Sequence, residues 1–240
     1  EIKKKHLIRD ERLFLEEQIS QFKDKPLLAN RYLLMDMLGK GGFSEVFRAY
    51  DIMSSRYVAC KIHVIQQTWT YEKKTTYIRH VKRECEIQAK LQHPHIVKLF
   101  EVVVIDSETL MLVLEQCNEG DLDTYLKLKG RITEEEAISI MIQILDALVA
   151  LKYHYSQEQQ IIHYDLKPGN VLFHNGVAKI SDFGLSKQKD INSSNIDLSS
   201  QGAGTIGYLP PECFCPAAKI SPSVDIWSCG IIMYQMLYGE

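Results

Sequence analysis

The stretch that decides the fold is residues 162–170, which read IHYDLKPGN, with Asp182-Phe183-Gly184 after it. Each of these motifs occurs by chance in unrelated proteins, and a lone histidine such as His163 is more often packed in a core than catalytic. An ordered set of motifs is much more specific than any one of them. The residues around this stretch therefore decide its meaning.

A glycine-rich stretch, residues 38–46 (LGKGGFSEV), precedes it in the sequence. Glycines let backbone N–H groups approach a phosphate that a Cβ would obstruct, but they also serve ordinary hairpins. A dinucleotide-binding fingerprint needs a helix directly after the glycines, whereas residues 45–50 have the pattern of a strand. The pattern therefore favours a glycine-rich hairpin over a dinucleotide site.

Lys61 ends a short apolar run, residues 57–61, where an ammonium is expensive to bury without a partner. One interpretation is an edge strand whose lysine reaches water. The other is an ion pair with an acid on the helical stretch at 74–90, where Glu84 and Glu86 both qualify. The residues alone leave this choice open.

In this order the motifs resemble those of a eukaryotic protein kinase: H-x-D-L-x-x-x-N, then D-F-G, then Pro210-Pro211-Glu212 in place of A-P-E. The resemblance implies an α+β, bilobal protein-kinase-like fold, with a kinase domain over 31–240. It implies a small β-rich N-lobe at 31–114, a hinge at 115–119 and a helical C-lobe at 120–240. Hydrophobic patterning predicts strands at 32–38, 44–51, 57–64, 100–105 and 109–115, and helices at 74–90, 122–128 and 134–155.

The resemblance also implies chemical roles, because phosphoryl transfer depends mainly on positioning and charge neutralisation. The catalytic residues would be Asp165, which accepts or orients the proton of the attacking hydroxyl, and Lys167, which neutralises charge on the γ-phosphate. Asn170 and Asp182 would bind Mg²⁺ through hard oxygen ligands. A lysine at position 167 resembles the Ser/Thr-specific class, and Thr205 would link the catalytic and substrate-binding loops. ATP and Mg²⁺ are the implied cofactors.

The implied ATP-binding residues come from both lobes and the hinge. The kinase spacing selects Glu84 over Glu86 as the partner of Lys61, and this pair would hold the α- and β-phosphates. The implied set is Leu38, Gly39, Lys40, Gly41, Gly42, Phe43, Ser44, Glu45 and Val46 in the glycine-rich stretch, Lys61 with Glu84, Ala59 and Leu172 beside adenine together with Val46, Leu114 as gatekeeper, Glu115 and Cys117 at the edge of the base, and Asp121 at the ribose.

The most informative departure from the kinase pattern is Tyr164, where the H-R-D motif has arginine. The resemblance implies that this arginine, in many kinases, binds a phosphorylated activation-loop residue through a charge-assisted contact. Tyrosine cannot do so. We therefore predict that activity needs no single activation-loop phosphate read in that way. The modification sites to consider are Ser193, Ser194, Ser199 and Ser200.

The closer resemblance is to the tousled-like kinases, because H-Y-D-L-K-P-G-N is unusual among kinases; segments 20–24, 30–34, 201–205 and 208–214 add to it. This resemblance implies a nuclear Ser/Thr kinase that phosphorylates histone chaperones in chromatin assembly. It also implies a homo-oligomer formed through an upstream coiled coil. Residues 1–25 are then expected to be a helical or coiled-coil leader, with a solvated or disordered tail as the alternative.

Composition and charge bound the class of protein. The 240 residues carry 28 Lys+Arg and 31 Asp+Glu, a net charge of -3, with no basic patch that would predict direct nucleic-acid binding. Six widely spaced cysteines indicate reduced thiols rather than a disulfide scaffold. Because the start lacks a signal peptide and no apolar stretch is of bilayer length, we expect an intracellular protein without a membrane segment.

The alternative function is a non-catalytic ATP-binding scaffold, either a pseudokinase or an inactive truncated fragment. The complete set of catalytic residue types speaks against it, because a pseudokinase usually lacks at least one. The chain is also expected to stop before the last helices of the C-lobe. No arginine follows Arg131 to pair with Glu212. Since an unpaired buried charge costs about 3–5 kcal/mol, we expect the isolated chain to fold poorly or to be inactive.

Overall fold

The computed structural model describes Ser20, Phe22 and residues 27–153, 159–190, 204–215 and 220–239. The chain divides into two compact units. Unit 1 comprises Glu1–Cys85 with Lys98–Gln116, and unit 2 comprises Glu86–Val97 with Cys117–Glu240. Apart from Ser20 and Phe22, the predicted leader lies outside the described residues, as do the four serines considered as modification sites.

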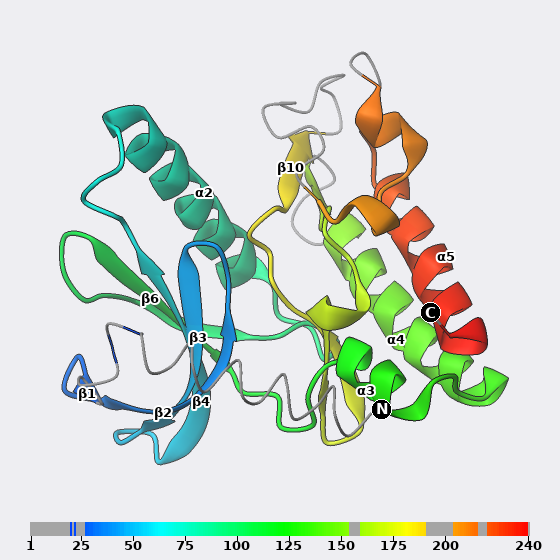
Figure 1. Ribbon diagram of the computed structural model, residues 1–240, viewed down its shortest axis with the longest axis horizontal. Helices are drawn as coiled ribbons and strands as arrows, with labels where there is room; N and C mark the ends of the chain where they lie inside the picture. Colours follow the sequence, from blue (N-terminus) through cyan, green and yellow to red (C-terminus); the bar gives the residue numbers. More distant parts are fainter. Residues whose placement is uncertain are drawn as a thin grey trace. The chain divides into compact units, whose positions relative to one another are not determined.

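Unit 1 is built on a six-stranded antiparallel sheet with the strand order β1-β2-β3-β4-β6-β5, which is visibly curled in Figure 1. Its strands are β1 Leu27–Leu28, β2 Tyr32–Lys40, β3 Ser44–Asp51, β4 Arg56–Val64, β5 Leu99–Val104 and β6 Thr109–Glu115. The five strands predicted from the sequence are confirmed, with ends displaced by at most two residues. The two-residue strand β1 was not predicted.

Successive side chains of a strand point to opposite faces of the sheet, and one face carries the core of unit 1. Phe47, Cys60 and Val113 lie in register across β3, β4 and β6 and are at most 2% exposed. Phe22 joins this core by packing edge-on against Phe47, with the ring centroids 6.3 Å apart. The opposite face is left for the charged and nucleotide-directed residues described below.

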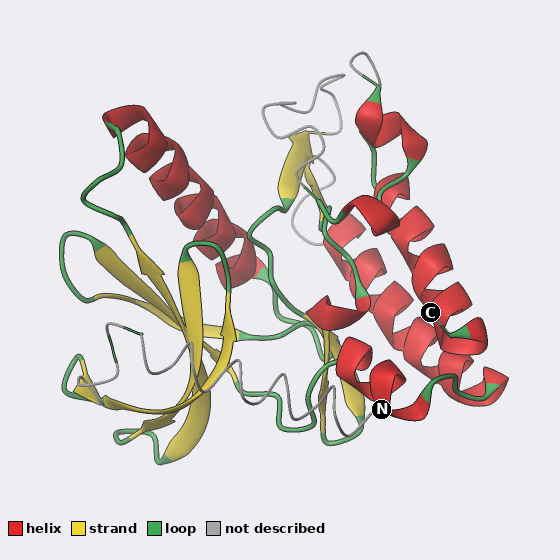
Figure 2. Cartoon of the chain, viewed as in Figure 1, coloured by secondary structure: helices red, strands yellow, loops and turns green. Residues whose placement is uncertain are grey.

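The long helix α2 Tyr71–Lys90 follows β4 and lies beside the strands of unit 1 in Figure 2. It begins three residues before the predicted start because Thr70 caps it: the Thr70 hydroxyl accepts from the Lys73 amide at 3.3 Å. From Glu86 onward the helix belongs to unit 2, where Ile87 is fully buried in the core. One helix thus supplies side chains to both units.

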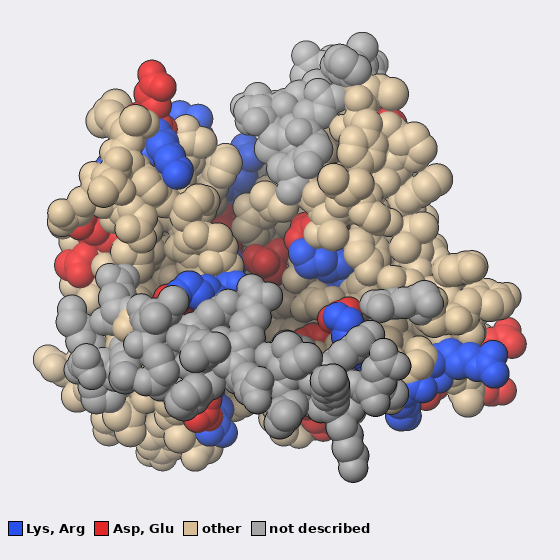
Figure 3. All heavy atoms as spheres, viewed as in Figure 1, with Lys and Arg blue, Asp and Glu red and all other residues tan. Residues whose placement is uncertain are grey.

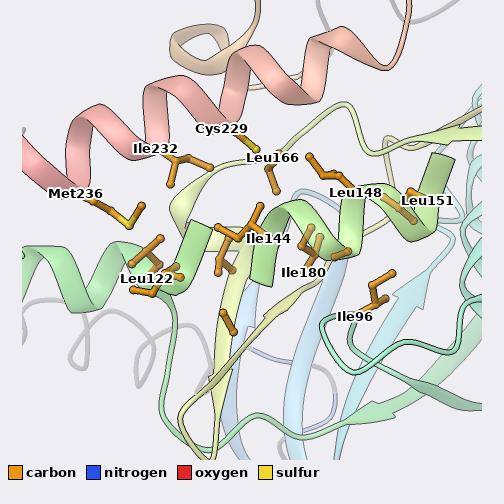
Figure 4. Close-up of a cluster of buried hydrophobic side chains, with 14 of the residues drawn as sticks. Ile96, Leu122, Ile144, Leu148, Leu151, Leu166, Ile180, Cys229, Ile232 and Met236 are labelled. Carbon is orange, nitrogen blue, oxygen red and sulfur yellow. The ribbon is translucent and has the colours of Figure 1, made fainter. Parts of the chain in front are cut away.

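Unit 2 has a helical frame formed by α3 Leu122–Lys129, α4 Glu134–Tyr153 and α5 Ser223–Tyr238. The helix predicted at 122–128 is confirmed, and the one predicted at 134–155 is confirmed as far as Tyr153, since 154–155 lie outside the described residues. The buried residues of α4 recur every three or four positions, as one face of an amphipathic helix requires. Figure 4 shows Ile144 of α4 facing Ile232 and Met236 of α5 in the core of this unit.

Short elements hold the loops of unit 2. Strand β7 Gln159–Ile162 pairs with β10 Lys187–Asp190, and β8 Val171–His174 pairs with β9 Val177–Ile180. The 3-10 helices are η1 Pro168–Asn170, η2 Ile206–Tyr208 and η3 Pro211–Phe214. Residues 163–167 follow β7 and Asp182 follows β9, so both kinase-like motifs sit directly after a strand.

The exposed face of α5 is apolar and aromatic. Its one charged residue, Asp225, is buried, whereas Ile226, Trp227 and Tyr234 are each at least 46% exposed. The surface over α5 is accordingly almost free of charged side chains in Figure 3, while residues of both signs gather near α3. Across the described parts of the chain, none of the helices combines the length and the apolar character needed to cross a membrane.

The full burial expected for Glu212 is wrong. This residue lies in η3 and is only partly buried. The cost of an unpaired charge applies to a fully desolvated group. The sequence suggested burial because the family resemblance pairs this glutamate with an arginine.

Candidate active site

The strand register of unit 1 places the predicted nucleotide residues on one face of the sheet. Val46 lies opposite Lys61, and Ala59 lies opposite Leu114. Lys61 and Ala59 are two residues apart on β4, so all four side chains share a face. Gly39 of β2 pairs with Val46 and continues this face to the glycine-rich turn. The period of two, which the sequence already displays, is what brings these residues together.

Lys61 and Glu84 form a buried ion pair within unit 1. The Lys61 ammonium lies 2.5 Å from Glu84 Oε1, and the two residues are 9% and 3% exposed. This settles the choice between the two acids, because Glu86 is exposed to solvent. Two residues along a helix correspond to a rotation of roughly 200°, so only one of the two acids can face β4. Burial of Lys61 is compatible with its charge because Glu84 supplies the partner.

The glycine-rich turn between β2 and β3 is closed by a hydrogen bond from the Gly41 amide to the Ser44 carbonyl at 2.7 Å. A Cβ at Gly41 would lie 3.0 Å from Ser44 Oγ, so this position is tight even for alanine. Lys40 forms an ion pair with Glu45 at 3.0 Å, and the Ser20 hydroxyl donates to Glu45 at 2.6 Å. Leu38 to Lys40 end β2, Gly41 to Phe43 form the turn, and Ser44 to Val46 begin β3.

The second cluster lies within unit 2 and is centred on Asp165, which is 9% exposed. The Thr205 amide and hydroxyl both donate to Asp165 Oδ1, at 2.9 and 2.7 Å. The Lys167 ammonium donates to Asp165 Oδ2 at 2.8 Å and to the Thr205 hydroxyl at 2.9 Å. A Cβ at Gly204 would lie 2.7 Å from the Tyr164 carbonyl oxygen, so glycine is needed for Thr205 to approach this closely. Asp165, Lys167 and Thr205 are thus held in one fixed arrangement.

Asn170 contributes a side-chain amide to the cluster around Asp165. Its Nδ2 donates to the Asp165 carbonyl at 2.7 Å and to Asp165 Oδ2 at 3.2 Å. These bonds engage the nitrogen, so the side-chain oxygen is the atom that would meet a cation. Asp182 follows β9 in the left-handed region, with a φ of 63°, and its side chain is exposed. Both residues offer hard oxygen donors, which fit Mg²⁺ and suit a softer metal poorly.

A buried acid, Asp225, holds the backbone of the segment that contains Asp165. Asp225 of α5 accepts from the amides of His163 and Tyr164, at 2.8 and 2.9 Å. Burial raises the pKa of Asp225 above its ordinary value, while His163 and the two amide bonds act in the opposite direction. His163 in turn accepts from the Asp165 amide through Nδ1 at 3.3 Å, so its Nε2 donates to the Ser181 carbonyl at 2.9 Å. His163 is therefore a structural residue that links Asp165 to the strand end before Asp182.

The remaining predicted residues lie where the chain passes from unit 1 to unit 2. Glu115 ends β6, and its amide donates to the Lys98 carbonyl at 2.8 Å. Cys117 follows, half-buried. Asp121 caps α3 by accepting from the Thr124 amide at 2.7 Å, and it forms an isolated bridge with Leu172 of β8. Asp121 therefore has a structural role in addition to the predicted one.

Sequence reasoning missed the support that Asp225 gives to the loop. The signal was present, because Asp225 is the only charged residue in an otherwise apolar helix, and a buried acid needs partners. The partners themselves lie about sixty positions earlier in the chain, which no local pattern reveals.

Both clusters and the fold around them are those of a protein kinase. Residues 32–240 match the family model of the protein kinase domain, and the chain belongs to this family. The α+β kinase fold expected from the motifs is thereby confirmed.

The chain is similar to tousled-like kinases in particular, as the loop sequence indicated. "Serine/threonine-protein kinase TOUSLED" of Arabidopsis thaliana is 50% identical over 98% of this chain and 34% of its own length. "Serine/threonine-protein kinase tousled-like 2" of Xenopus tropicalis is 51% identical over 97% of this chain and 35% of its own length. The protein of the same name from Homo sapiens is 50% identical over 97% of this chain and 31% of its own length. The chain spans about a third of the length of these curated relatives.

Proposed function

We propose that this chain is the catalytic part of a serine/threonine protein kinase that transfers the γ-phosphate of ATP to Ser or Thr hydroxyls of protein substrates. The observation that carries the proposal is the fixed arrangement of Asp165, Lys167 and Thr205, in which one carboxylate, one ammonium and one hydroxyl lie within 2.9 Å of each other. This cluster combines a proton acceptor with a charge for a transferred phosphoryl group.

In this proposal Asp165 orients the substrate hydroxyl and accepts its proton, and Lys167 neutralises charge that grows on the transferred group. Thr205 fixes the carboxylate so that little reorganisation is needed when the hydroxyl arrives. ATP would supply the phosphoryl group and Mg²⁺ would neutralise its oxygens when bound. Asn170 and Asp182 are the residues that would hold the metal, because their oxygens are of the kind it prefers.

Within unit 1, Lys61 would contact the α- and β-phosphates, held in place by Glu84. The backbone of the glycine-rich turn would approach the same phosphates. Val46, Ala59 and Leu114 share the sheet face with Lys61 and would contact adenine. These roles rest on the shared face and on the ion pair described above, together with the kinase family to which the chain belongs.

The finer assignment rests on the resemblance to tousled-like kinases. We propose a nuclear protein whose substrates are histone chaperones in chromatin assembly, and which forms a homo-oligomer through a coiled coil upstream of the kinase domain. The sequence motifs shared with that family and the named relatives support this proposal. It is separable from the enzymatic proposal, which depends only on the residues of the two clusters.

The decisive experiment is a radiolabel transfer assay on a panel of Ser, Thr and Tyr peptides, comparing the wild type with Asp165→Asn. The amide keeps the shape of Asp165 but cannot accept the hydroxyl proton, so turnover should fall by about 10² to 10⁴. Binding of a fluorescent ATP analogue should stay within about twofold of the wild type, since this substitution leaves the nucleotide contacts in place.

Equal transfer by both proteins would remove Asp165 from the catalytic role. Nucleotide binding by the wild type without transfer to any peptide of the panel would favour the non-catalytic scaffold. Preferential labelling of Tyr peptides would contradict the assignment of Lys167 to the Ser/Thr class.

A further inference from the structure

Phe43, at the tip of the glycine-rich turn, is packed against the start of α2. Its ring lies edge-on to Trp69 and to Tyr77, with centroid distances of 4.7 and 5.6 Å, and these two rings lie 5.1 Å from each other. The Lys73 ammonium lies 4.9 Å from the Phe43 ring centroid and 4.5 Å from that of Trp69. All of these residues belong to unit 1, so the contacts form within one compact body.

The same tyrosine also contacts the backbone of the turn. The Tyr77 hydroxyl donates to the Phe43 carbonyl at 2.8 Å, and it lies 2.8 Å from Nδ1 of His63. A hydroxyl has one proton, and a carbonyl can only accept. The proton of Tyr77 therefore goes to Phe43, and His63 Nδ1 must be the donor to the Tyr77 oxygen. This fixes the protonation of one ring nitrogen from the hydrogen bonds alone.

The other ring nitrogen of His63 points at the ion pair. Its Nε2 lies 3.8 Å from Glu84 Oε2, while Glu84 Oε1 holds Lys61 at 2.5 Å. His63 is 5% exposed and lies two residues after Lys61 on β4, hence on the same face of the sheet. Hydrogen bonds thus connect Phe43 to Tyr77 and Tyr77 to His63, and His63 Nε2 lies 3.8 Å from Glu84 Oε2, which it attracts when the ring is doubly protonated.

We infer that Tyr77 and His63 are positioning residues that couple the glycine-rich turn to the Lys61–Glu84 pair. The inference rests on the proposed function, in which the turn and Lys61 both meet the phosphates of ATP. A turn rich in glycine has a large conformational freedom to lose when it closes on a ligand. The contacts between the tip of the turn and α2 reduce the conformational entropy that the turn loses on binding. The turn and the Lys61 ammonium are therefore both positioned before ATP binds.

The test uses Tyr77→Phe, which keeps the aromatic packing and removes only the hydroxyl, with Tyr57→Phe as the matched control. Tyr57 lies on the same sheet and is 52% exposed. Tyr77→Phe removes the hydrogen bond to the Phe43 carbonyl and the one from His63 Nδ1, and we expect ATP to bind roughly five- to tenfold more weakly as a result. We expect that rise in the KM for ATP and in the Kd of a fluorescent ATP analogue, with kcat within about twofold. Tyr57→Phe should leave all three unchanged.

A second pair of variants separates coupling from mere stability. His63→Leu should weaken nucleotide binding as Tyr77→Phe does, and the double variant should be no worse than either, because both break the same series of contacts. His63→Asn, whose amide nitrogen replaces Nδ1 as a donor, should recover part of the loss. Additive effects in the double variant, accompanied by an equal loss of melting temperature, would reduce both residues to structural roles and overturn the inference.

Hydrogen exchange of the nucleotide-free protein makes the test independent of catalysis. In Tyr77→Phe the amides of residues 41–44 should exchange faster than in the wild type, and those of α2 around Glu84 should follow. Unchanged exchange in both segments would contradict the coupling. Absence of peptide phosphorylation by the wild type, with these exchange effects present, would instead count against the proposed function alone.

Discussion

Tyr164 occupies the position where the kinase motif has arginine, and its ring forms a cation–π contact with Lys187. It is 1% exposed, has a φ of 69°, and its amide donates a hydrogen bond to Asp225 Oδ1 at 2.9 Å. Lys187 is 2% exposed, and its ammonium lies 3.7 Å from the centroid of the Tyr164 ring. An ammonium over an aromatic face is attracted by the ring quadrupole, most strongly when both are shielded from water. The positive charge of Lys187 is thus stabilised by the Tyr164 ring within the folded chain.

This contact predicts different outcomes for two replacements of Tyr164. Tyr164→Phe keeps the ring and should lower the free energy of unfolding only slightly, whereas Tyr164→Leu should lower it by about 2 kcal/mol. The loss in Tyr164→Leu should shrink in a Lys187→Met background, as a double-mutant cycle by urea denaturation would measure. Tyr153→Leu, which breaks the exposed contact with Lys152, should cost less than about 1 kcal/mol. Equal losses for Phe and Leu at position 164 would contradict the argument.

The same contact supports the prediction that no single activation-loop phosphate is read at this position. Replacement of Ser193, Ser194, Ser199 and Ser200 by alanine should leave kcat/KM within about twofold of the wild type, as expected for changes outside a site. The measurement is steady-state turnover of a Ser/Thr peptide, with nucleotide binding followed in parallel. If the fourfold variant loses its turnover while it still binds ATP, a phosphate on this segment is required after all.

At the residue scale, the sequence predicted the residues of the two proposed site clusters, but not the residue that holds the backbone around Asp165 in place. The positions of Lys61, Glu84 and Asp165 followed from motif spacing, which the kinase family fixes. Asp225 was not predicted as a support, because its role depends on amides that come into reach only when α5 packs on the rest of unit 2. Burial of Glu212 was expected from the family pattern and is wrong for the same reason: exposure is a property of the packed chain.

At the element scale, a bidentate ion pair joins Arg31, the residue before β2, to Asp51, the last residue of β3. Arg31 donates from Nε and Nη2 to the two carboxylate oxygens of Asp51, both at 2.7 Å, and Asp51 is fully buried. The Arg31 bond lowers the pKa of Asp51 far below its ordinary value. A lowered carboxylate pKa stabilises the fold above the unfolded-state pKa of about 4 and loses that contribution as the pH falls through the folded-state value.

Asp51→Asn should therefore lower the free energy of unfolding by about 2 kcal/mol at pH 7, because it removes the bidentate charged partner of Arg31 and leaves only the ion pair with Glu101 at 2.7 Å. The difference from the wild type should narrow as the pH falls from 5 toward 2, which urea denaturation at several pH values would measure. The control is Asp36→Asn, which removes the exposed partner of Arg48 and should cost less than about 1 kcal/mol. A difference that does not vary with pH would mean that Asp51 acts through packing instead of charge.

The lengths of the elements explain which of them the sequence revealed. The five long strands of unit 1 and the helices α2, α3 and α4 were predicted because each contains several repeats of its period. Strands β7 to β10 have four residues each, too few to display alternation against the surrounding polarity. β7 pairs with β10, which lies far from it in the chain, so these two strands depend on the fold more than on local preference, whereas β8 and β9 are neighbours joined by Asn175 and Gly176.

At the scale of the whole molecule, the groups proposed to bind nucleotide divide between the two units. Unit 1 contains the glycine-rich turn, Lys61 and Glu84, and unit 2 contains Asn170 and Asp182. Each set is organised by contacts within its own unit, as the Lys61–Glu84 and Asn170–Asp165 bonds show. Organisation of each half before binding reduces the conformational cost of binding. It also means that loss of either set should be visible in the response of the whole chain to ATP.

ATP with Mg²⁺ should therefore raise the melting temperature of the wild type, and substitution of a residue proposed to meet the phosphates or their metal, in either unit, should remove most of the shift. At a ligand concentration of 100 times Kd the stabilisation is about 2.7 kcal/mol, or roughly 5–10 °C for a chain of this size. Lys61→Met in unit 1 and Asp182→Asn in unit 2 should each remove most of that shift, because each deletes a charge proposed to meet the phosphates or their metal. Lys127→Met, on the exposed side of α3 in unit 2, should retain it. A full shift in Asp182→Asn would show that unit 1 binds the nucleotide without help from unit 2, and the assignment of Asp182 to the metal would then fall.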